Sequence, residues 1–332
     1  MKLLKTLIAT TALVGAATFA NAQANPAVIF DLGGKFDKSF NEMSYTGAER
    51  FREETGIEYR EFELQSDAQR EQALRRFAQA GNNPVVVAGF SNATAMNTVA
   101  PDFPDTDFVI IDMVVDQPNV RSVIFAEHEG SYLVGVLAAM ASESGTVSFV
   151  GGMDIPLISK FQCGYTQGAK AVNPDITVLA TMTGTDGSAW NNPVKGGELT
   201  MSQIENGSDV VFAAAGGTGR GVLQAAADAG IYAIGVDANQ NYMQPGTMLT
   251  SMMKRVDVAV YNAFNDVNNG EFTAGIQVMG LAEDGVGYAL DEYNADLITP
   301  EMKAAVDQAR ADIIAGNIVV HDYTVDNTCP VE

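Results

Sequence analysis

The sequence predicts an α/β protein made of two doubly wound lobes, each with a mostly parallel sheet. Short strands rich in Val, Ile and Ala alternate with amphipathic helices along the chain. The strands are apolar throughout, which is typical of parallel sheets that helices cover on both faces. The chain has 332 residues, more than a single hydrophobic core usually holds. Two βαβ units in one chain therefore indicate two lobes.

The first half of the chain contains four predicted strands. Gly56 and Gly81 stand where the first two helices should stop, because glycine readily adopts the left-handed conformation that ends a helix. The predicted strands are 27–32, 57–62, 85–88 and 108–111, and the predicted helices are 39–54 and 67–79.

The same alternation restarts near residue 132, which indicates a second sheet of the same kind. The predicted helices are 132–140, 155–172, 194–206 and 221–229, and the predicted strands are 147–150, 176–182, 210–214 and 232–236.

The N-terminal residues have the order of a secretory signal peptide over 1–22. Lys2 and Lys5 precede an apolar run over 7–19, and Ala20-Asn21-Ala22 offers small residues for a signal peptidase. The apolar run is shorter than the ~20 residues of a membrane helix, so a membrane anchor is the weaker alternative. No Cys follows the cleavage site. We therefore expect a periplasmic protein that begins at Gln23 and carries no lipid anchor.

The charge and the cysteines exclude several classes of function. A net charge of −22 argues against binding nucleic acid or anionic membranes. Cys163 and Cys329 are the only cysteines, and in an oxidising compartment an isolated pair is expected to form a disulfide. His128 and His321 are the only histidines and lie far apart in the sequence. We therefore expect no metal site, no cofactor and no Cys–His nucleophile.

Three carboxylates directly follow predicted strands: Asp31, Asp112 and Asp237. Because ligands of parallel sheets bind beyond the carboxyl ends of the strands, these residues predict an acidic cleft between the lobes. A glycine-rich segment over 215–221 also follows a strand, although its spacing matches no phosphate-binding motif. Its glycines permit either an anion site or a close approach of the backbone to a ligand or to the other lobe.

Two aromatic residues stand beside this predicted cleft. Phe40 lies in the first turn of a helix with Asn41 beside it, and Trp190 occupies a polar loop where a core role is hard to explain. Asp37 is better explained as a helix cap than as a ligand contact. Lys254 either neutralises a cleft carboxylate, donates to a ligand hydroxyl or is an ordinary surface lysine.

Six motifs occur in order along nearly the whole mature length. They are Asp31-x-Gly-Gly up to Ser39-Phe40-Asn41, Glu129-Gly-Ser-Tyr-Leu-x-Gly135, Phe149-Val-Gly-Gly-Met-Asp-Ile-Pro156, Ala215-Gly-Gly-Thr-Gly219, Gly235-Val-Asp-Ala-Asn-Gln240 and Thr250-Ser-Met-Met-Lys-Arg-Val-Asp257. With them the chain resembles the basic membrane protein family of solute-binding proteins, also called the purine nucleoside receptor family. The resemblance implies a type I periplasmic binding fold that closes on its ligand and delivers it to an ABC permease in the inner membrane.

The resemblance also implies lobe boundaries, with three crossover strands joining the lobes. The expected first lobe is 23–127 with 240–280, the second is 128–239 with 281–325, and 326–332 forms a tail.

Binding roles follow from the resemblance for eight residues. Phe40 and Trp190 would stack on the base, although relatives usually carry Phe at the second position. Asp31 and Asn41 would contact the base edge, and Asp237 and Lys254 the ribose hydroxyls. Asp112 and Gly216 complete the expected ligand-binding set, with no specific contact implied for either.

The chemistry of this set suits a nucleoside. Base–aromatic stacking contributes about 1–3 kcal/mol per base, and carboxylates accept from ring N–H groups and from hydroxyls. Three carboxylates against one lysine would repel phosphate, which favours a nucleoside, with purine preferred, over a nucleotide. A sugar, a free base or another small aromatic solute is the alternative ligand.

We do not expect an enzyme. A periplasmic nucleoside hydrolase would need a metal-binding Asp cluster near the first strand, and no adjacent Asp pair occurs there. The signal peptide and the missing helix-turn-helix exclude a transcription regulator of the same fold. We expect the protein to act as a monomer.

Overall fold

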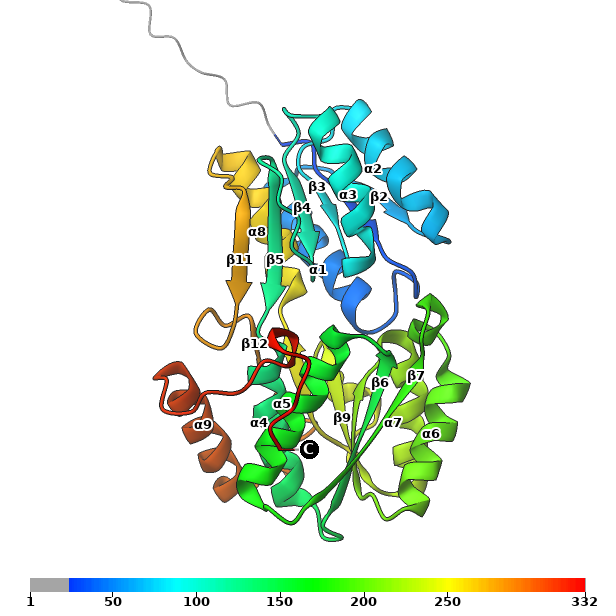
Figure 1. Ribbon diagram of the computed structural model, residues 1–332, viewed down its shortest axis with the longest axis vertical. Coiled ribbons are helices and arrows are strands. Elements are labelled where there is room, and N and C mark those ends of the chain that lie inside the picture. Colours follow the sequence, from blue (N-terminus) through cyan, green and yellow to red (C-terminus); the bar gives the residue numbers. More distant parts are fainter. Residues whose placement is uncertain (1–23, 332) are drawn as a thin grey trace, which may run out of the picture.

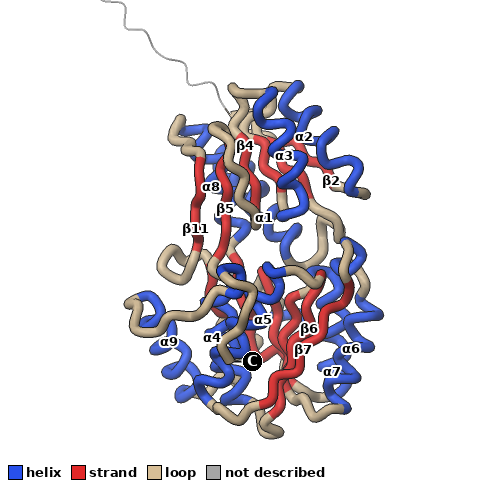
Figure 2. The backbone as a smooth tube through the Cα atoms, in the orientation of Figure 1, coloured by secondary structure: helices blue, strands red, loops and turns tan. Residues whose placement is uncertain are grey.

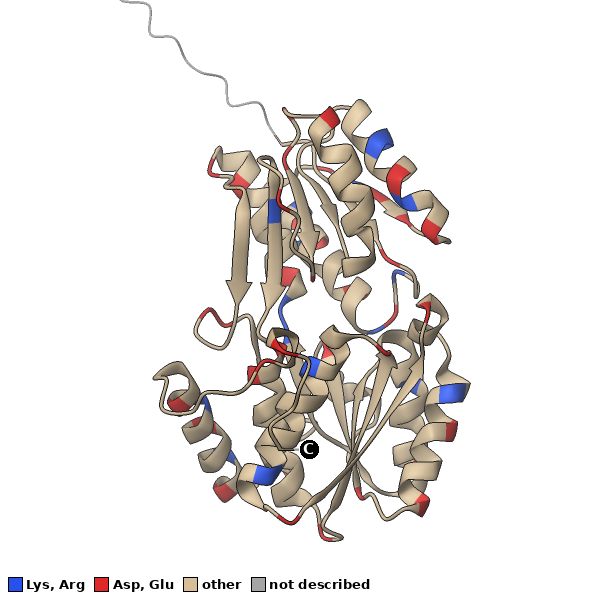
Figure 3. Cartoon of the chain, viewed as in Figure 1, with Lys and Arg blue, Asp and Glu red and all other residues tan. Residues whose placement is uncertain are grey.

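The computed structural model describes residues 24–331, which form two lobes stacked along the long axis of the molecule (Figure 1). The expected signal peptide lies outside the described residues. Within residues 24–331, no helix is both long and apolar enough to cross a bilayer. Asp and Glu residues occur along the ribbon of both lobes (Figure 3).

The first lobe contains a six-stranded sheet in which every neighbouring pair is parallel, in the order β11-β5-β4-β3-β1-β2. Its helices α1 and α8 cover one face, and α2 and α3 cover the other (Figure 2). The strands are β1 Ala27–Phe30, β2 Arg60–Glu63, β3 Val85–Val87, β4 Phe108–Ile111, β5 Val120–Phe125 and β11 Gly275–Met279, and the helices are α1 Phe40–Thr55, α2 Arg70–Gln79, α3 Ala93–Val99 and α8 Val256–Asn269.

The second lobe repeats this arrangement with the order β12-β10-β9-β8-β6-β7, in which only β12 is antiparallel to its neighbour. The strands are β6 Thr146–Met153, β7 Thr177–Gly184, β8 Val210–Ala214, β9 Tyr232–Asp237, β10 Met248–Lys254 and β12 Val286–Tyr288, and the helices are α4 Glu127–Ala141, α5 Pro156–Val172, α6 Pro193–Glu205, α7 Gly219–Ala229 and α9 Pro300–Ile314. Two lobes with mostly parallel sheets confirm the predicted α/β fold of the type I periplasmic binding class.

Within residues 24–331, the chain passes between the lobes three times: from β5 to α4, from β10 to α8 and from β11 to β12. The boundary expected at residue 240 is wrong, because β10 pairs with β9 and therefore extends the second sheet. The return to the first lobe comes after Lys254, where α8 packs closely on α1. A Cβ atom at Gly47 of α1 would lie 2.2 Å from the carbonyl oxygen of Asp257.

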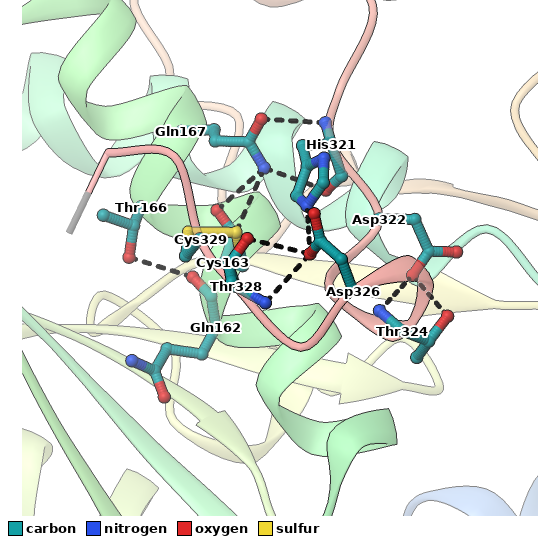
Figure 4. The surroundings of a disulfide bond; sticks show 10 residues. All are labelled: Gln162, Cys163, Thr166, Gln167, His321, Asp322, Thr324, Asp326, Thr328 and Cys329. Atoms are coloured by element: carbon teal, nitrogen blue, oxygen red, sulfur yellow. Dashed lines mark hydrogen bonds and ion pairs between the residues drawn. A yellow bond between two sulfur atoms is a disulfide. The ribbon is translucent and has the colours of Figure 1, made fainter.

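The expected disulfide is present and joins Cys163 of α5 to Cys329, with an S–S distance of 2.07 Å (Figure 4). Two further bonds hold the C-terminal segment on α5. Gln167 donates from Nε2 to the carbonyl of His321 at 3.0 Å and accepts from its N–H at 2.8 Å. The segment after α9 is therefore fixed along one side of α5.

Candidate ligand-binding site

A pocket lies between the lobes, beyond the carboxyl ends of both sheets. The space between its lining atoms is about 610 Å³, including its opening to solvent. All eight residues expected to bind ligand line it: Asp31, Phe40, Asn41, Asp112, Trp190, Gly216, Asp237 and Lys254. The other lining residues are Leu32, Asp37, Gly89, Phe90, Leu157, Ile158, Phe161, Ala214 and Val236.

Asp31 follows β1 and is buried together with Arg70, a partner that the sequence analysis did not predict. Its Oδ1 accepts from Nη1 of Arg70 at 2.6 Å and from the N–H of Leu32 at 2.8 Å. Arg70 begins α2 and is also bonded to Asp67. Burial raises the pKa of Asp31, while Arg70 opposes that effect. Oδ2 of Asp31 lies beside Gly89 at the end of β3.

Asn41 is committed to the backbone of the loop between β1 and α1. Its Oδ1 accepts from the N–H of Asp31 at 2.9 Å, and its Nδ2 donates to the carbonyls of Asp31 and Gly34 at 3.1 and 3.3 Å. Since both N–H groups of the amide are used, only the remaining lone pair of Oδ1 can contact a ligand. Asn41 lines the pocket as expected, but its bonds fix the loop that presents Asp31.

Asp37 has the capping role that the sequence predicts. Its carboxylate accepts from the N–H groups of Ser39, Asn41 and Glu42 at 2.8–3.1 Å, which satisfies free donors at the start of α1. The side chain also lines the pocket and is buried. Burial raises its pKa to about 7, although the three N–H donors oppose this.

Asp112 and Asp237 share a backbone conformation that side-chain-bearing residues rarely adopt. Asp112 follows β4 and Asp237 is the last residue of β9, and their φ angles are +71° and +63°. Asp tolerates this left-handed region better than most residues, and such conformations concentrate at functional sites. The two lobes therefore present one carboxylate each from a comparable turn at the end of a strand.

Hydrogen bonds connect the lobes at one side of the pocket. Ser39 of the first lobe donates from Oγ to Oδ2 of Asp237 in the second. Beside it, Gln240 donates from Nε2 to the carbonyl of Lys38 at 2.8 Å. Burial raises the pKa of Asp237, while nearby Lys254 and Ser39 oppose that effect. The described conformation is thus one in which the lobes touch.

Lys254 ends β10 with its side chain fully enclosed. Its Nζ lies 2.7 Å from Asp112 and 2.9 Å from Glu127, and 5.1–5.6 Å from the ring centres of Phe40, Phe125 and Phe161. Burial alone would lower the pKa of Lys254, but the surrounding carboxylates outweigh it and raise that pKa. Of the alternatives for Lys254, the structure excludes an exposed surface lysine.

The two rings of the pocket come from opposite lobes. Phe40 is the first residue of α1, and Trp190 ends the short helix Gly187–Trp190. Gly152 leaves room for the indole, since a Cβ atom there would lie 2.1 Å from Cζ3 of Trp190. One ring therefore approaches the pocket from each side of the cleft.

The glycine-rich segment supports the loop of Trp190. Thr218 donates from Oγ1 to the carbonyl of Ala189 and accepts from the N–H of Asn192, both at 2.7 Å. A Cβ atom at Gly217 would lie 3.2 Å from the carbonyl oxygen of Trp190. These contacts lie within the second lobe. The close approach to the other lobe that the glycines permit is seen where a Cβ atom at Gly217 would lie 3.7 Å from the Cβ atom of Asp37.

Glu127 is the other charged residue that the sequence did not single out. It begins α4, is 1 % exposed and lies between Lys254 and Lys160.

Within residues 24–331, no group of three or more His, Cys, Asp or Glu side chains is arranged to hold a metal ion.

Comparisons with known proteins identify the family of the chain and solved structures with the same fold. Residues 24–323 match the family of PnrA-like ABC transporter substrate-binding proteins, Bmp. The chain is 33% identical over 318 residues to the ABC transporter nucleoside-binding protein BmpA of Lactococcus lactis, covering 89% of this chain and 88% of that protein. It is 36% identical over 278 residues to an uncharacterized lipoprotein of Pyrococcus abyssi, covering 79% of this chain and 68% of that one.

A solved structure of an ABC transporter solute-binding protein from Aeropyrum pernix superposes with a TM-score of 0.82 at 30% identity, covering 90% of this chain and 94% of that one. A transcriptional activator of the comK gene from Bacillus halodurans shares the fold, with a TM-score of 0.76 at 21% identity over 90% of this chain and 100% of that one. The chain belongs to the Bmp family of PnrA-like ABC transporter substrate-binding proteins.

Proposed function

We propose that the protein binds a nucleoside, with purine favoured, in the pocket between its lobes and delivers it to an ABC permease in the inner membrane. One observation carries the proposal: Phe40 and Trp190 approach the pocket from opposite lobes, and carboxylates flank them on both sides. A planar base fits between rings that come from two lobes, because closure brings them onto its two faces. Each stacked base contributes about 1–3 kcal/mol.

The polar groups suit the edges of such a ligand. With Oδ1 of Asp31 held by Arg70, Oδ2 is an acceptor for a ring N–H group. Asp237 gives one oxygen to Ser39 and keeps the other for a hydroxyl. The ammonium of Lys254 has three N–H groups, and with Asp112 and Glu127 as partners it retains one for the ligand.

The charge of the pocket favours a nucleoside over a nucleotide. Four carboxylates line it, and Lys254 is the one cation among its described lining residues. Arg70 faces Asp31 and Asp67, so its charge is already compensated. A phosphate group would meet net negative charge in a site of low dielectric constant. The name of the Lactococcus relative gives independent support for nucleosides.

The test is isothermal titration calorimetry with inosine, guanosine, adenosine, uridine, ribose, hypoxanthine and inosine monophosphate. We expect the purine nucleosides to bind most tightly, and ribose, hypoxanthine and the monophosphate more weakly. Trp190 is the only tryptophan, so its fluorescence should change on binding. If no nucleoside binds while ribose or another sugar does, the proposal is wrong.

A pair of variants tests the site. Phe40→Ala should weaken binding by about 5- to 100-fold, the loss of one stacking face. Phe36→Ala is the matched control, because Phe36 lies close in sequence but is 58% exposed and does not line the pocket. Equal affinity in both variants would contradict the assignment of Phe40.

We further propose that the mature protein is a periplasmic monomer without a lipid anchor. Some relatives are named lipoproteins, so the anchor needs its own test. The intact mass of the protein recovered from the periplasm should correspond to an unmodified chain that begins at Gln23. A mass increased by acyl chains would contradict this proposal.

A further inference from the structure

Five charged side chains of alternating sign form a continuous row that begins in the pocket. Asp112 and Lys254 are 2.7 Å apart, Lys254 and Glu127 2.9 Å, Glu127 and Lys160 3.0 Å, and Lys160 and Asp322 3.2 Å. The side chains of the first four are at most 8% exposed. Asp322, at 25%, is the member nearest to solvent. The row therefore connects the ligand pocket with the C-terminal segment.

The row runs through the connections between the lobes. Lys254 is the last residue before the β10–α8 crossover, and Glu127 is the first residue after the β5–α4 crossover. Lys160 also donates to the carbonyl of Phe125, at the end of β5, at 2.7 Å. Lys160 thus ties the β5–α4 crossover to α5, and the β10–α8 crossover is linked to it through the Glu127–Lys254 pair.

The C-terminal end of the row is held in place by covalent and hydrogen bonds (Figure 4). Lys160 and Cys163 are three residues apart on α5 and so share one face of the helix. The disulfide to Cys329 fixes the segment on that face. Asp322 itself accepts from the N–H of Thr324 at 2.9 Å and from its hydroxyl at 2.7 Å. This arrangement keeps the carboxylate of Asp322 opposite Lys160.

We propose that Glu127, Lys160 and Asp322 are positioning residues of the ligand site, through which the disulfide-bonded C-terminal segment sets the place of the Lys254 ammonium. None of the three lines the ligand pocket, although all three line a neighbouring cavity that shares Phe90, Asp112 and Leu157 with it. Their link to the lining residues of the ligand pocket is the pair of Glu127 with Lys254. This inference rests on the proposed function for its ligand but not for its geometry.

The physical basis is the balance of buried charge. Lys254 lies near three carboxylates, Asp112, Glu127 and Asp237. Without the carboxylate of Asp322, the ammonium of Lys160 interacts more strongly with Glu127. The interaction of Glu127 with Lys254 is then weaker. Lys254 shifts toward Asp112 and Asp237 and occupies the acceptor that a ligand hydroxyl would use. Removing one member of a buried set of charges leaves its partner uncompensated, so the effect travels along the row.

The experiment compares Asp322→Asn with Asp326→Asn in the full-length mature protein. Asparagine keeps an acceptor for Thr324 but removes the charge that faces Lys160. Asp326 lies in the same segment and bonds His321 and Thr328 instead of Lys160. By calorimetry with inosine, D322N should bind about 3- to 10-fold more weakly than the wild type, and D326N should bind like the wild type. Equal affinities in D322N and D326N would overturn the proposal.

A double-mutant cycle separates positioning from a general loss of stability. In an Asp112→Asn background, D322N should have clearly less effect on inosine affinity than in the wild type, because both substitutions act on Lys254. In a Trp190→Ala background, which removes the pocket ring that does not lie over the Lys254 ammonium, its effect should remain at full size. Additive effects with D112N would overturn the proposal.

If the wild type binds no nucleoside, the proposed function fails, and the row is then tested without ligand. The decreases in thermal unfolding midpoint caused by D112N and D322N should be non-additive, whereas those of D112N and D326N should add. Additivity in both pairs would overturn the row as an energetically coupled unit.

Discussion

Asp31 and Gly89 face one another at the carboxyl ends of two neighbouring strands, and the carboxylate occupies the space that a side chain at residue 89 would fill. A Cβ atom there would lie 2.2 Å from Oδ2 of Asp31. Gly89→Ala should therefore displace the carboxylate from the pocket. A hydrogen bond to a charged group contributes about 1.5–3 kcal/mol, so we expect inosine affinity by calorimetry to fall about 10-fold or more.

The control for this variant is Gly246→Ala. Gly246 has a φ of +86°, close to the +95° of Gly89, and a Cβ atom there meets nothing within 4 Å. Both variants place an alanine at a positive φ, which residues with a side chain rarely adopt. An equal loss of affinity in the two variants would show that strain, and not the displacement of Asp31, is responsible.

Arg70 should matter far more for stability than the other arginine pairs of its helix. It forms a 2.6 Å ion pair with Asp31 in which both side chains are buried. Arg70→Met leaves that carboxylate buried and unpaired, so the free energy of unfolding should fall by about 3–5 kcal/mol. Urea unfolding measures the change.

Arg75→Met on the same helix is the matched control for Arg70. Its partners Glu71 and Asp102 have side chains 50% and 55% exposed, so its loss should cost less than ~1 kcal/mol. Similar losses for the two variants would mean that the Asp31 pair contributes no more than a surface pair.

Asp37 should make stability depend on pH. Its pKa rises from 3.8 to about 7 on folding because the carboxyl group is buried. Between these two values the folded state binds more protons than the unfolded state, so the contribution of Asp37 to stability falls as the pH rises. The slope reaches at most ~1.4 kcal/mol per pH unit.

Asp37→Asn removes this titration and leaves the other groups in place. The stability of the wild type relative to D37N, from urea unfolding at pH 5, 6 and 7, should therefore decrease steadily as the pH rises. A difference that stays constant over this range would show that Asp37 is ionised throughout.

The disulfide should stabilise the second lobe. Cys163 and Cys329 are 166 residues apart in sequence, so the bridge closes a long loop in the unfolded chain. Cys329→Ser should lower the free energy of unfolding by about 2–5 kcal/mol. Dithiothreitol should lower the wild-type stability by a similar amount and leave a Cys163→Ser, Cys329→Ser double variant unchanged. Insensitivity of the wild type to the reductant would contradict the prediction.

Continuous apolar strands were predictable from the sequence, whereas β5 was not. Arg121 and Ser122 interrupt its apolar pattern. Arg121 is buried because Asp266 of α8 meets it at 2.6 Å, and that partner lies far along the chain. The expected boundary at residue 240 placed β10 in the first lobe, whereas β10 pairs with β9 in the second. A strand's sequence identifies it as a strand, but its pairing partner decides the sheet to which it belongs.

The acidic residues of the pocket could be predicted because they stand at the ends of strands. The buried residues that form ion pairs with the charged groups of the pocket could not be predicted in this way. Asp31 and Asp112 directly follow a strand and Asp237 ends one, so one rule places all three. Arg70 and Glu127 lie at helix starts, where charged residues are usually solvated. Only the packing of α2 and α4 against strand ends makes Arg70 the partner of Asp31 and Glu127 the partner of Lys254.

The left-handed turns at Asp112 and Asp237 restrict how this pocket can diversify. Most replacements would carry a Cβ branch or a longer side chain into a conformation that disfavours them, whereas asparagine fits the same turn at little cost. An Asp-to-Asn exchange keeps the shape and adds an N–H donor where only acceptors were present. Relatives that recognise ligands with acceptors at these positions could therefore arise by one substitution at either turn, with the backbone unchanged.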